Sequence, residues 1–320
     1  MVLKYNTIFC YTNLGDIMTD MNKRVLELIN SKNNMKQISA ILNISEKQLY
    51  TRIKQLMLEG YLLSPSYSYN SDIYYNICKE IKPENNTIGI SIPKKEQVFS
   101  CIVFSDLHVG NIDSDIRLLD IVYNYAIKKG YNYILNCGDS LEGEYTTDKK
   151  SISAYEEQVL EFIKKYPYDR NIINFMIFGN HDYHALKTNG YDVSKKIKNS
   201  RYDIVPIGYG QGNVKLKNDY LVLFHRLNEV SEPDMQHDEK IVLSGHGHLM
   251  KTKFREELWL CIPTLSYVST DKTTSILPSF VDLELQFEKG LIDYVTAKQI
   301  IITPKPIQIS ESRCLVKNIR

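Results

Sequence analysis

Five short polar segments carry residue types that bind metal ions or transfer protons, and each follows an apolar run. Five of the seven histidines of the chain lie in these segments. Carboxylates, imidazoles and an amide oxygen form a ligand set suited to Mn²⁺, Fe or Zn²⁺. The sequence therefore predicts a metal centre. Its segments are Ser105-Asp106-Leu107-His108, Gly138-Asp139-Ser140-Leu141-Glu142, Gly179-Asn180-His181-Asp182, His225 and Gly245-His246-Gly247-His248.

The apolar runs are expected to be strands that deliver these segments to one place. They cover residues 98–104, 131–137, 172–178, 220–224 and 240–244. Amphipathic helical stretches at 114–130, 151–167 and about 185–199 alternate with them, as in α/β domains, and short strands in hairpins follow residue 202. Because α/β folds build sites at the carboxyl ends of strands, we expect the segments to converge. In Asp106-x-His108 and His246-x-His248 a strand would direct both side chains to one face.

Each segment is less informative alone than in the set. An isolated Asp-x-His or Gly-Asp is typical of a polar loop, Gly-Asn-His-Asp of a turn, and a single His225 of a buried histidine with satisfied hydrogen bonds. Gly-His-Gly-His is less common. All five in order, each after a strand and accompanied by glycines that let the backbone approach a ligand closely, indicate one site.

The ordered set resembles the DxH…GD…GNH(D/E)…H…GHxH series of the calcineurin-like metallophosphoesterase superfamily, over roughly residues 97–300. The resemblance implies an α/β, four-layer αββα sandwich in which two mixed sheets lie face to face with helices outside. It also implies a site for two divalent metal ions, Mn²⁺ first, with Fe, Zn²⁺ or Ni²⁺ as alternatives. By the resemblance, Asp106, His108 and His248 would hold one ion, Asn180, His225 and His246 the other, and Asp139 would bridge both.

The resemblance assigns the remaining polar residues of these segments to catalysis. His181 would not bind metal but would face the leaving group as a general acid. Glu142 stands where many members have Asp, in the position that orients the imidazole of the GNH motif. Asp182 would be a partner behind the ligands or a brace of the loop. A metal-bridging hydroxide would attack the phosphate in line.

The N-terminal part has a different pattern. Helical periodicity covers most of residues 20–60, and Ser45 with Gln48 three residues later forms a capping box. Gly60 suits the end of that helix, and residues 61–77 have the pattern of a small hairpin. The stretch KQISAILNISEKQLYTRIKQLMLEGYLL resembles the winged helix-turn-helix module, with Asn43 at the turn position that tolerates a left-handed conformation.

This resemblance implies DNA as a partner. The exposed face of the second helix of the motif would contact DNA through Lys47, Gln48, Thr51, Arg52 and Lys54. Residues 1–80 contain nine lysines and arginines against seven acids, which is a weak electrostatic footprint. Winged helices also serve as protein-contact or dimerisation modules, so assembly into a homo-oligomer remains open.

The bulk composition limits the class of protein. The 39 Lys+Arg nearly balance the 38 Asp+Glu, for a net charge of +1, so a generally basic, nucleic-acid-coating protein is not indicated. No apolar run is long enough for a membrane span, and the N-terminus lacks a signal-peptide pattern. The six scattered cysteines without CxxC suggest reduced thiols and a cytoplasmic location.

These observations lead to a domain division and to three functional hypotheses. We expect a winged-helix domain at 1–80, a linker at 81–96, a metallophosphoesterase domain at 97–300 and a C-terminal tail at 301–320. The first hypothesis is a DNA-directed nuclease, which needs cations such as Arg226, Lys251 and Lys253 beside the metals. The second is a phosphomonoesterase or small-nucleotide phosphodiesterase. The third is a DNA-binding regulator with a ligand-sensing phosphoesterase domain, against which the complete ligand set argues.

Overall fold

A computed structural model of the chain describes residues 19–79, 86–145, 154–235, 240–254, 256–268, 276–304 and 307–318. These residues form two compact units. The first unit contains residues 19–65 and 73–79, and the second contains residues 66–72 and the described residues from 86 onward. Among the helices of the described residues, none has the length and apolar character needed to cross a membrane.

The first unit is built from three helices, α1 (Asp20–Asn30), α2 (Met35–Leu42) and α3 (Glu46–Leu58), and from β2 (Ile73–Ile77). Each helix buries one apolar stripe, as the helical periodicity predicts. The capping box is confirmed, since the Ser45 side chain accepts from the Gln48 amide and the Gln48 side chain accepts from the Ser45 amide. Asn43 adopts the left-handed conformation between α2 and α3, at φ 52°.

In the second unit, one mixed sheet, called sheet B here, carries three of the five site segments. Its order is β15-β14-β13-β4-β5-β6-β7. Strands β4 (Val98–Phe104), β5 (Tyr133–Cys137), β6 (Ile173–Phe178) and β7 (Ile204–Tyr209) run parallel. β13 (Ser279–Glu288), β14 (Leu291–Pro304) and β15 (Ile307–Asn318) extend the sheet antiparallel. Every residue of β5 and β6 is buried, as expected for central parallel strands.

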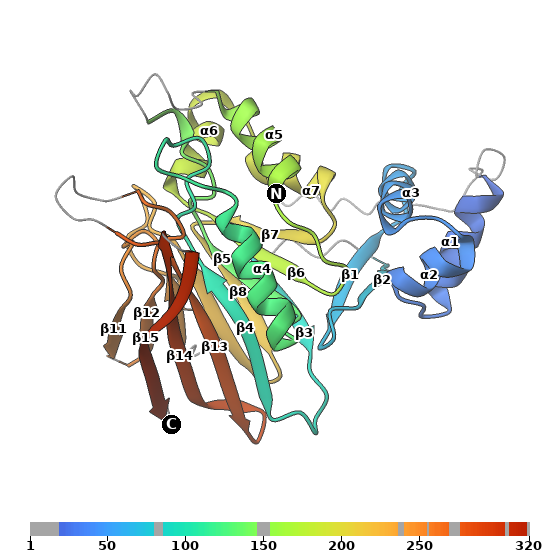
Figure 1. The fold of residues 1–320 in the computed structure, drawn as a ribbon. Helices are drawn as coiled ribbons and strands as arrows, with labels where there is room; N and C mark the ends of the chain where they lie inside the picture. The colour runs from blue at the N-terminus through green and yellow to red at the C-terminus, as the bar shows by residue number, and fades with distance from the viewer. Residues whose placement is uncertain are drawn as a thin grey trace, which may run out of the picture. The chain divides into compact units, whose positions relative to one another are not determined.

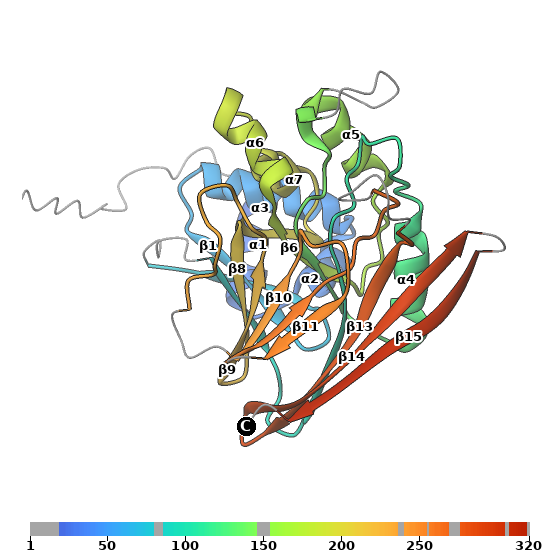
Figure 2. The ribbon, with the colours of Figure 1, turned by 90° about the vertical axis from the view of Figure 1, so that its left-hand side faces the viewer.

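The other mixed sheet, called sheet A, carries the two remaining segments. Within the second unit its order is β11-β12-β10-β9-β8-β3, and residues 67 and 68 of β1 (Leu63–Ser68) pair with β3. These strands are β3 (Thr87–Ser91), β8 (Gln211–Leu216), β9 (Asp219–Phe224), β10 (Ile241–Ser244), β11 (Lys251–Phe254) and β12 (Leu258–Cys261). Contacts join β5 to β9 and β6 to β8, so the two sheets face each other (Figures 1 and 2).

The helices of the second unit pack on sheet B. They are α4 (Leu118–Lys129), α5 (Tyr155–Lys165), α6 (Asn180–Asn189) and α7 (Val193–Ser200), with a short 3-10 turn at Gly143–Tyr145. A large apolar cluster joins α4, α5 and α7 to the strands below them. The second unit is thus a mixed α/β fold with two mixed sheets, whereas a helix layer on sheet A, expected from the four-layer resemblance, stays a prediction.

Three elements differ from the sequence-based expectation. Residues 87–91, expected in a linker, form β3, which pairs with β8 and β1 inside sheet A. Residues 307–318, where no strand was expected, form β15 and pair with β14 along most of its length. One helix was expected at about 185–199, but two are present, and the first of them begins at Asn180 inside the GNHD segment.

Candidate metal centre

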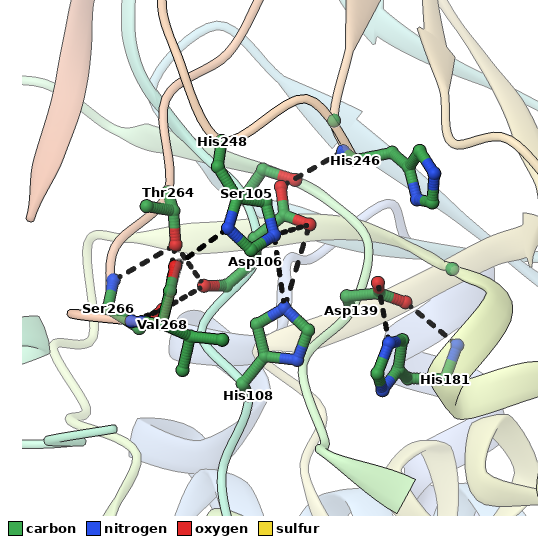
Figure 3. A network of polar contacts seen from close by, with 12 residues as sticks. Ser105, Asp106, His108, Asp139, His181, His246, His248, Thr264, Ser266 and Val268 are labelled. Atoms are coloured by element: carbon green, nitrogen blue, oxygen red, sulfur yellow. Dashed lines mark hydrogen bonds and ion pairs between the residues drawn. The ribbon is translucent and has the colours of Figure 1, made fainter. Parts of the chain in front are cut away.

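The five polar segments meet at the carboxyl ends of β4, β5, β6, β9 and β10 (Figure 3). Three overlapping groups of side chains have ligand atoms within 4.8 Å of one another. Two residues, His108 and Asp139, each belong to two of the groups. The groups are Asp106 with His108 and His248, His108 with Asp139 and His181, and Asp139 with His225 and His246.

The backbone beneath these side chains is unusual. Five residues that are not glycine have positive φ angles between 51° and 72°. This left-handed region is uncommon for such residues and costs on the order of 1 kcal/mol each. The strand-based expectation for Asp-x-His and His-x-His is therefore wrong, because both motifs lie in loops beyond their strands and left-handed turns direct the side chains. The five residues are Asp106, His108, Asp139, His246 and His248.

The first group is almost completely buried. The Nε2 atoms of His108 and His248 lie 3.4 Å apart, and Asp106 Oδ1 lies 3.4 Å from His248 Nε2 and 3.9 Å from His108 Nε2. Three ligand atoms of different side chains thus point at one small volume. The structure brings together the residues that the resemblance assigns to one ion.

The group of Asp139, His225 and His246 forms around the Asp139 carboxylate. Its Oδ2 atom lies 3.1 Å from His225 Nε2. His246 Nδ1 lies 3.0 Å from Asn180 Oδ1, so the amide expected as a ligand is beside the expected imidazole. The His225 and His246 rings meet edge to face at 5.3 Å. Since Asp139 also lies in the group with His108, it occupies the position between the two expected ion sites.

Hydrogen bonds at the far nitrogen orient two of the buried imidazoles. His225 Nδ1 donates to the carbonyl oxygen of Cys137 at 2.7 Å, and His248 Nδ1 donates to that of Val268 at 2.8 Å. A carbonyl only accepts, so Nδ1 of each ring carries a proton, and Nε2 faces the centre as the atom that would bind an ion in place of a proton. This is the arrangement that prepares a histidine for metal binding.

Glu142 and His181 are arranged differently from the expectation. The Glu142 carboxylate lies 3.0 Å from His108 Nδ1 and 3.9 Å from His181 Nδ1. The imidazole of His181 is held instead by the backbone oxygen of Glu142, at 2.5 Å from Nδ1. The carboxylate thus stands behind His108, while the backbone orients His181. The longer side chain of glutamate reaches past the position expected for the shorter aspartate.

Asp182 connects two of the loops. It is fully buried and accepts from the amides of Ser140, Leu141 and Gly179 at 3.2, 2.9 and 3.0 Å. The first two amides follow Asp139, and the third precedes helix α6. Asp182 thus fixes the GD loop to the first turn of the helix that carries His181. This contact is the brace that the sequence suggested as one of two roles for Asp182.

Burial and neighbouring charges shift the pKa values of the buried groups of the centre, in several cases in opposite directions. Burial alone would raise the pKa of Asp139, but the charges of His225, His181 and His108 hold this pKa below its usual range. Burial alone would lower the pKa of His225, yet the charge of Asp139 raises it to about 9. Burial and the charge of Asp139 raise the pKa of Asp182 to about 7, against three donated amides. Positive charge near the buried carboxylates therefore stabilises their ionised form.

Several buried atoms test whether metal ions fit this site. Asp106 Oδ1 and His225 Nε2 are inaccessible to solvent and form no hydrogen bond, although His248 Nε2 lies 3.4 Å from the first atom and Asp139 Oδ2 lies 3.1 Å from the second. Buried polar atoms without hydrogen bonds are costly. One of these atoms belongs to the group with His248, and the other belongs to the group with Asp139 and His246. Facing lone pairs, such as the Nε2 atoms of His108 and His248, also need a cation between them. The residues present therefore fit divalent metal ions.

Three residues of this site have no signal in the sequence motifs. Thr264 Oγ1 and Ser266 Oγ donate to the backbone oxygen of Asp106 at 2.7 and 3.0 Å, and Val268 accepts from His248. Figure 3 shows these three residues beside the Asp106 and His248 side chains, on the left of the view. They follow β12 in an ordinary stretch, PTLSYVS, in which nothing marks contact with a distant loop. Only the tertiary structure identifies them.

The predicted DNA-contact residues lie on α3 of the first unit. Gln48 is engaged in the capping box, and the Thr51 hydroxyl donates to the backbone oxygen of Lys47. Arg52 reaches Asn22 Oδ1 at 3.5 Å, and Lys54 lies over the Tyr50 ring. Lys47 is exposed. A groove of about 410 Å³ is lined by Asn22, Ile44, Gln48, Thr51, Arg52 and Gln55.

Comparisons with known proteins agree with the motif series. The family model described as Calcineurin-like phosphoesterase matches residues 99–266, just over half of the chain. A search of curated proteins finds no match.

Similar solved structures include Vps29 from Entamoeba histolytica in complex with Zn²⁺, which is 13% identical, covers 69% of this chain and 100% of its own, and has a TM-score of 0.40. YfcE, a phosphoesterase from E. coli, is 17% identical, with the same coverage and a TM-score of 0.41. The nuclease MPE from Pseudomonas putida is 16% identical, covers 60% of this chain and 85% of its own, and has a TM-score of 0.33.

The two glycines of the GHGH segment provide a matched test of the site. A Cβ atom at Gly245 would meet the Cys137 backbone oxygen at 2.5 Å and His225 Nδ1 at 2.6 Å, whereas one at Gly247 would meet nothing within 4 Å. Gly245→Ala should therefore destabilise the protein by about 1–3 kcal/mol, the usual cost of overpacking. Gly247→Ala should leave the thermal unfolding midpoint unchanged. Equal midpoints for both variants would contradict the described packing around His225.

Proposed function

This chain belongs to the calcineurin-like phosphoesterase family and is a hydrolase of phosphate esters, and we propose that it is a two-metal phosphodiesterase that cleaves DNA. One observation supports the two-metal part above all others. Buried Asp139 belongs to two groups of ligand atoms, one with His108 and His181 and one with His225 and His246. A shared carboxylate is what two ions about 3.5–4 Å apart require.

The ligands in this proposal are those named from the motifs. Bound divalent ions, with Mn²⁺ first among the candidates, would supply charge that neutralises phosphoryl oxygens and makes hydroxide accessible at neutral pH. The protein provides a buried, fixed surrounding, because carbonyl groups orient His225 and His248 and a carboxylate lies behind His108. It thereby reduces the reorganisation that the reaction would otherwise require.

His181 is proposed as the general acid. It stands in the first turn of α6, and its side chain is 22% exposed, which leaves a path to substrate. The Glu142 backbone oxygen lies at Nδ1, so Nε2 faces Asp139 at 4.0 Å. A proton on Nε2 would be delivered to the departing oxygen. Asp182 holds the turn in place through the amide of Gly179.

DNA is proposed as the substrate because uncompensated cations lie close to the centre. Arg226 directly follows His225, is exposed, and has no ion pair with the described residues. Lys251 and Lys253 are exposed three and five residues after His248. The proposal includes a cytoplasmic location, where thiols stay reduced. DNA binding by α3, through the exposed Lys47 in particular, would hold the substrate near the enzyme.

A second candidate is a phosphomonoesterase or small-nucleotide phosphodiesterase whose first unit serves for assembly. Several large apolar side chains of the first unit face solvent, with Leu58 at 83% and Ile41 at 53% exposure. Exposed apolar side chains of this size are typical of protein contacts when they gather in one patch. Hydrolysis of p-nitrophenyl phosphate without hydrolysis of DNA, together with a homo-oligomer in solution, would favour this candidate.

Substitution of the shared carboxylate tests the two-metal assignment. Asp139→Asn should lower the occupancy of both metal sites, because one side chain would serve both. Metal analysis of the purified protein should give about two ions per chain for the wild type and fewer than one for the variant. Asp113→Asn, an exposed aspartate outside the groups, is the control and should keep two. Two ions retained by Asp139→Asn would refute the bridging role.

A second test separates the general acid from the ligands. His181→Ala should keep its metals, and its loss of activity should grow with the basicity of the leaving group. We expect a loss of about 10²–10⁴-fold on DNA and a much smaller loss on bis(p-nitrophenyl) phosphate, whose nitrophenolate leaves without a proton. His246→Ala should instead lose metal, and with it activity on both substrates. Equal losses in His181→Ala with full metal content would exclude the acid role.

The role of α3 can be tested without truncation. Deleting the first 80 residues would also remove the Tyr67 and Ser68 partners of β3, so point substitutions are preferable. Lys47→Glu should weaken binding of duplex DNA by about tenfold, the effect of one charged contact of about 1.5 kcal/mol. Lys23→Glu makes the same charge change on α1 and should have less effect. Equal effects at several salt concentrations would indicate that α3 does not contact DNA.

A further inference from the structure

Strand β11 leaves the metal centre along the edge of sheet A. It begins at Lys251, three residues after His248, and all four of its residues are exposed. Among the described strands its only partner is β12, to which it pairs antiparallel. Figure 1 shows β11 and β12 at this edge. The strand therefore offers an exposed surface that starts beside the site.

Two lysines of β11 lie opposite two residues of β12, a tryptophan and a cysteine, that are two positions apart. Lys253 pairs with Trp259, and Lys251 pairs with Cys261. Directly opposed residues of antiparallel strands project to the same face, and so do residues two apart. One face of this ladder thus presents two ammonium groups beside an indole ring. Trp259 is partly exposed and packs edge to face on Phe224, with ring centroids 6.2 Å apart.

A carboxylate lies at the indole, since Glu257 accepts from Trp259 Nε1 at 3.5 Å, but it forms no ion pair with either lysine in the described part of the chain. Within the part of the chain that the structure describes, neither Lys251 nor Lys253 forms an ion pair. Lysines also protect edge strands from pairing with other chains. Protection of an edge strand requires neither an aromatic residue opposite a lysine nor a position beside the metal centre. Unpaired ammonium groups next to a partly exposed indole match the two features of single-stranded nucleic acid, phosphates and unstacked bases.

The register places this surface close to the metal centre. Lys251 is opposite Cys261, and Cys261 is opposite Ser244, which lies two residues before His246. Two strand spacings separate the backbones of Lys251 and Ser244 by about 10 Å. Lys253 lies about 7 Å further along β11.

We infer that the surface formed by Lys251, Lys253 and Trp259, the lysine–tryptophan surface, binds a single-stranded polynucleotide next to the metal centre. The inference rests on the proposed function as a nuclease and assigns it a substrate form. The lysines contact successive phosphates and one base stacks on the indole. Duplex DNA does not fit this mode, because its bases are already stacked on one another.

The chain contains its own probe for this surface, since Trp259 is its single tryptophan. Full-length protein is kept metal-free with a chelator, so that no hydrolysis occurs, and is titrated with an oligothymidylate. We expect saturable quenching of tryptophan fluorescence, and weaker or no quenching with a hairpin duplex of equal charge. Binding without any change in fluorescence, or equal quenching by duplex and single strand, would overturn the inference.

Two variants measure the contribution of the lysines. Lys251→Ala combined with Lys253→Ala should weaken oligothymidylate binding at least tenfold. It should also lower the slope of log K against log salt by about 1.4, which is about 0.7 for each lost phosphate contact. Lys128→Ala with Lys164→Ala removes the same charge from exposed positions on α4 and α5 and should change neither. Equal behaviour of both double variants would overturn the inference.

The same experiment separates this inference from the proposed function. Hydrolysis of DNA by the metal-loaded wild type is measured independently of binding. If DNA is cleaved but the lysine variants bind the oligonucleotide normally, the nuclease proposal stands and the lysine–tryptophan surface is wrong. If the oligonucleotide quenches Trp259 but no nucleic acid is cleaved, the surface is right and the nuclease proposal is wrong.

Discussion

The burial of Asp139 is the constraint on which the rest of the centre depends. Its carboxylate is 1% exposed, and an isolated buried charge of this kind is expensive. The imidazole of His225, which directly follows β9, lies 3.1 Å from one carboxylate oxygen. The amide of His181, in the first turn of α6, donates to the other oxygen at a distance of 3.0 Å. A Cβ atom at Gly179 would overlap that same oxygen. One carboxylate thus fixes the loops after β5, β6 and β9 relative to one another.

The left-handed residues show how the backbone responds to this constraint. Asp106, His108 and Asp139 each adopt a conformation that costs energy, and each has a distant group that holds it there. The amide of Asp106 donates to Gly138 and that of His108 to Asp139, while Thr264 donates to the oxygen of Asp106. Unfavourable backbone conformations that contacts with distant residues maintain are typical of preorganised functional sites. These backbone contacts therefore determine where the ligand atoms lie.

The sequence predicted the members of the site better than their arrangement. Five motifs in order identified the residues that converge, because their types and positions after apolar runs are visible without a structure. The contact between the Glu142 carboxylate and His108 depends on side-chain length and loop path, so no motif contains it. Helix α6 begins earlier than expected because Asp182 caps it from inside the polar segment. Strand β3 was missed because its partner β8 is distant in sequence, and β15 was missed because no motif in the sequence marks its pairing with β14.

The charge of the centre connects this arrangement to its substrate class. Asp106 and Asp139 are buried carboxylates, and Glu142 adds a third beside His108, while the rings of His225 and His248 have their protons held at Nδ1. Before any hydroxide is counted, two divalent ions would exceed the charge of these three carboxylates by one, and Asp182, whose pKa is about 7, would offset part of that excess. A centre with a small positive excess attracts an anion without binding it irreversibly, and a phosphodiester carries a single negative charge. The neutral imidazoles matter here because anionic ligands in their place would remove that excess.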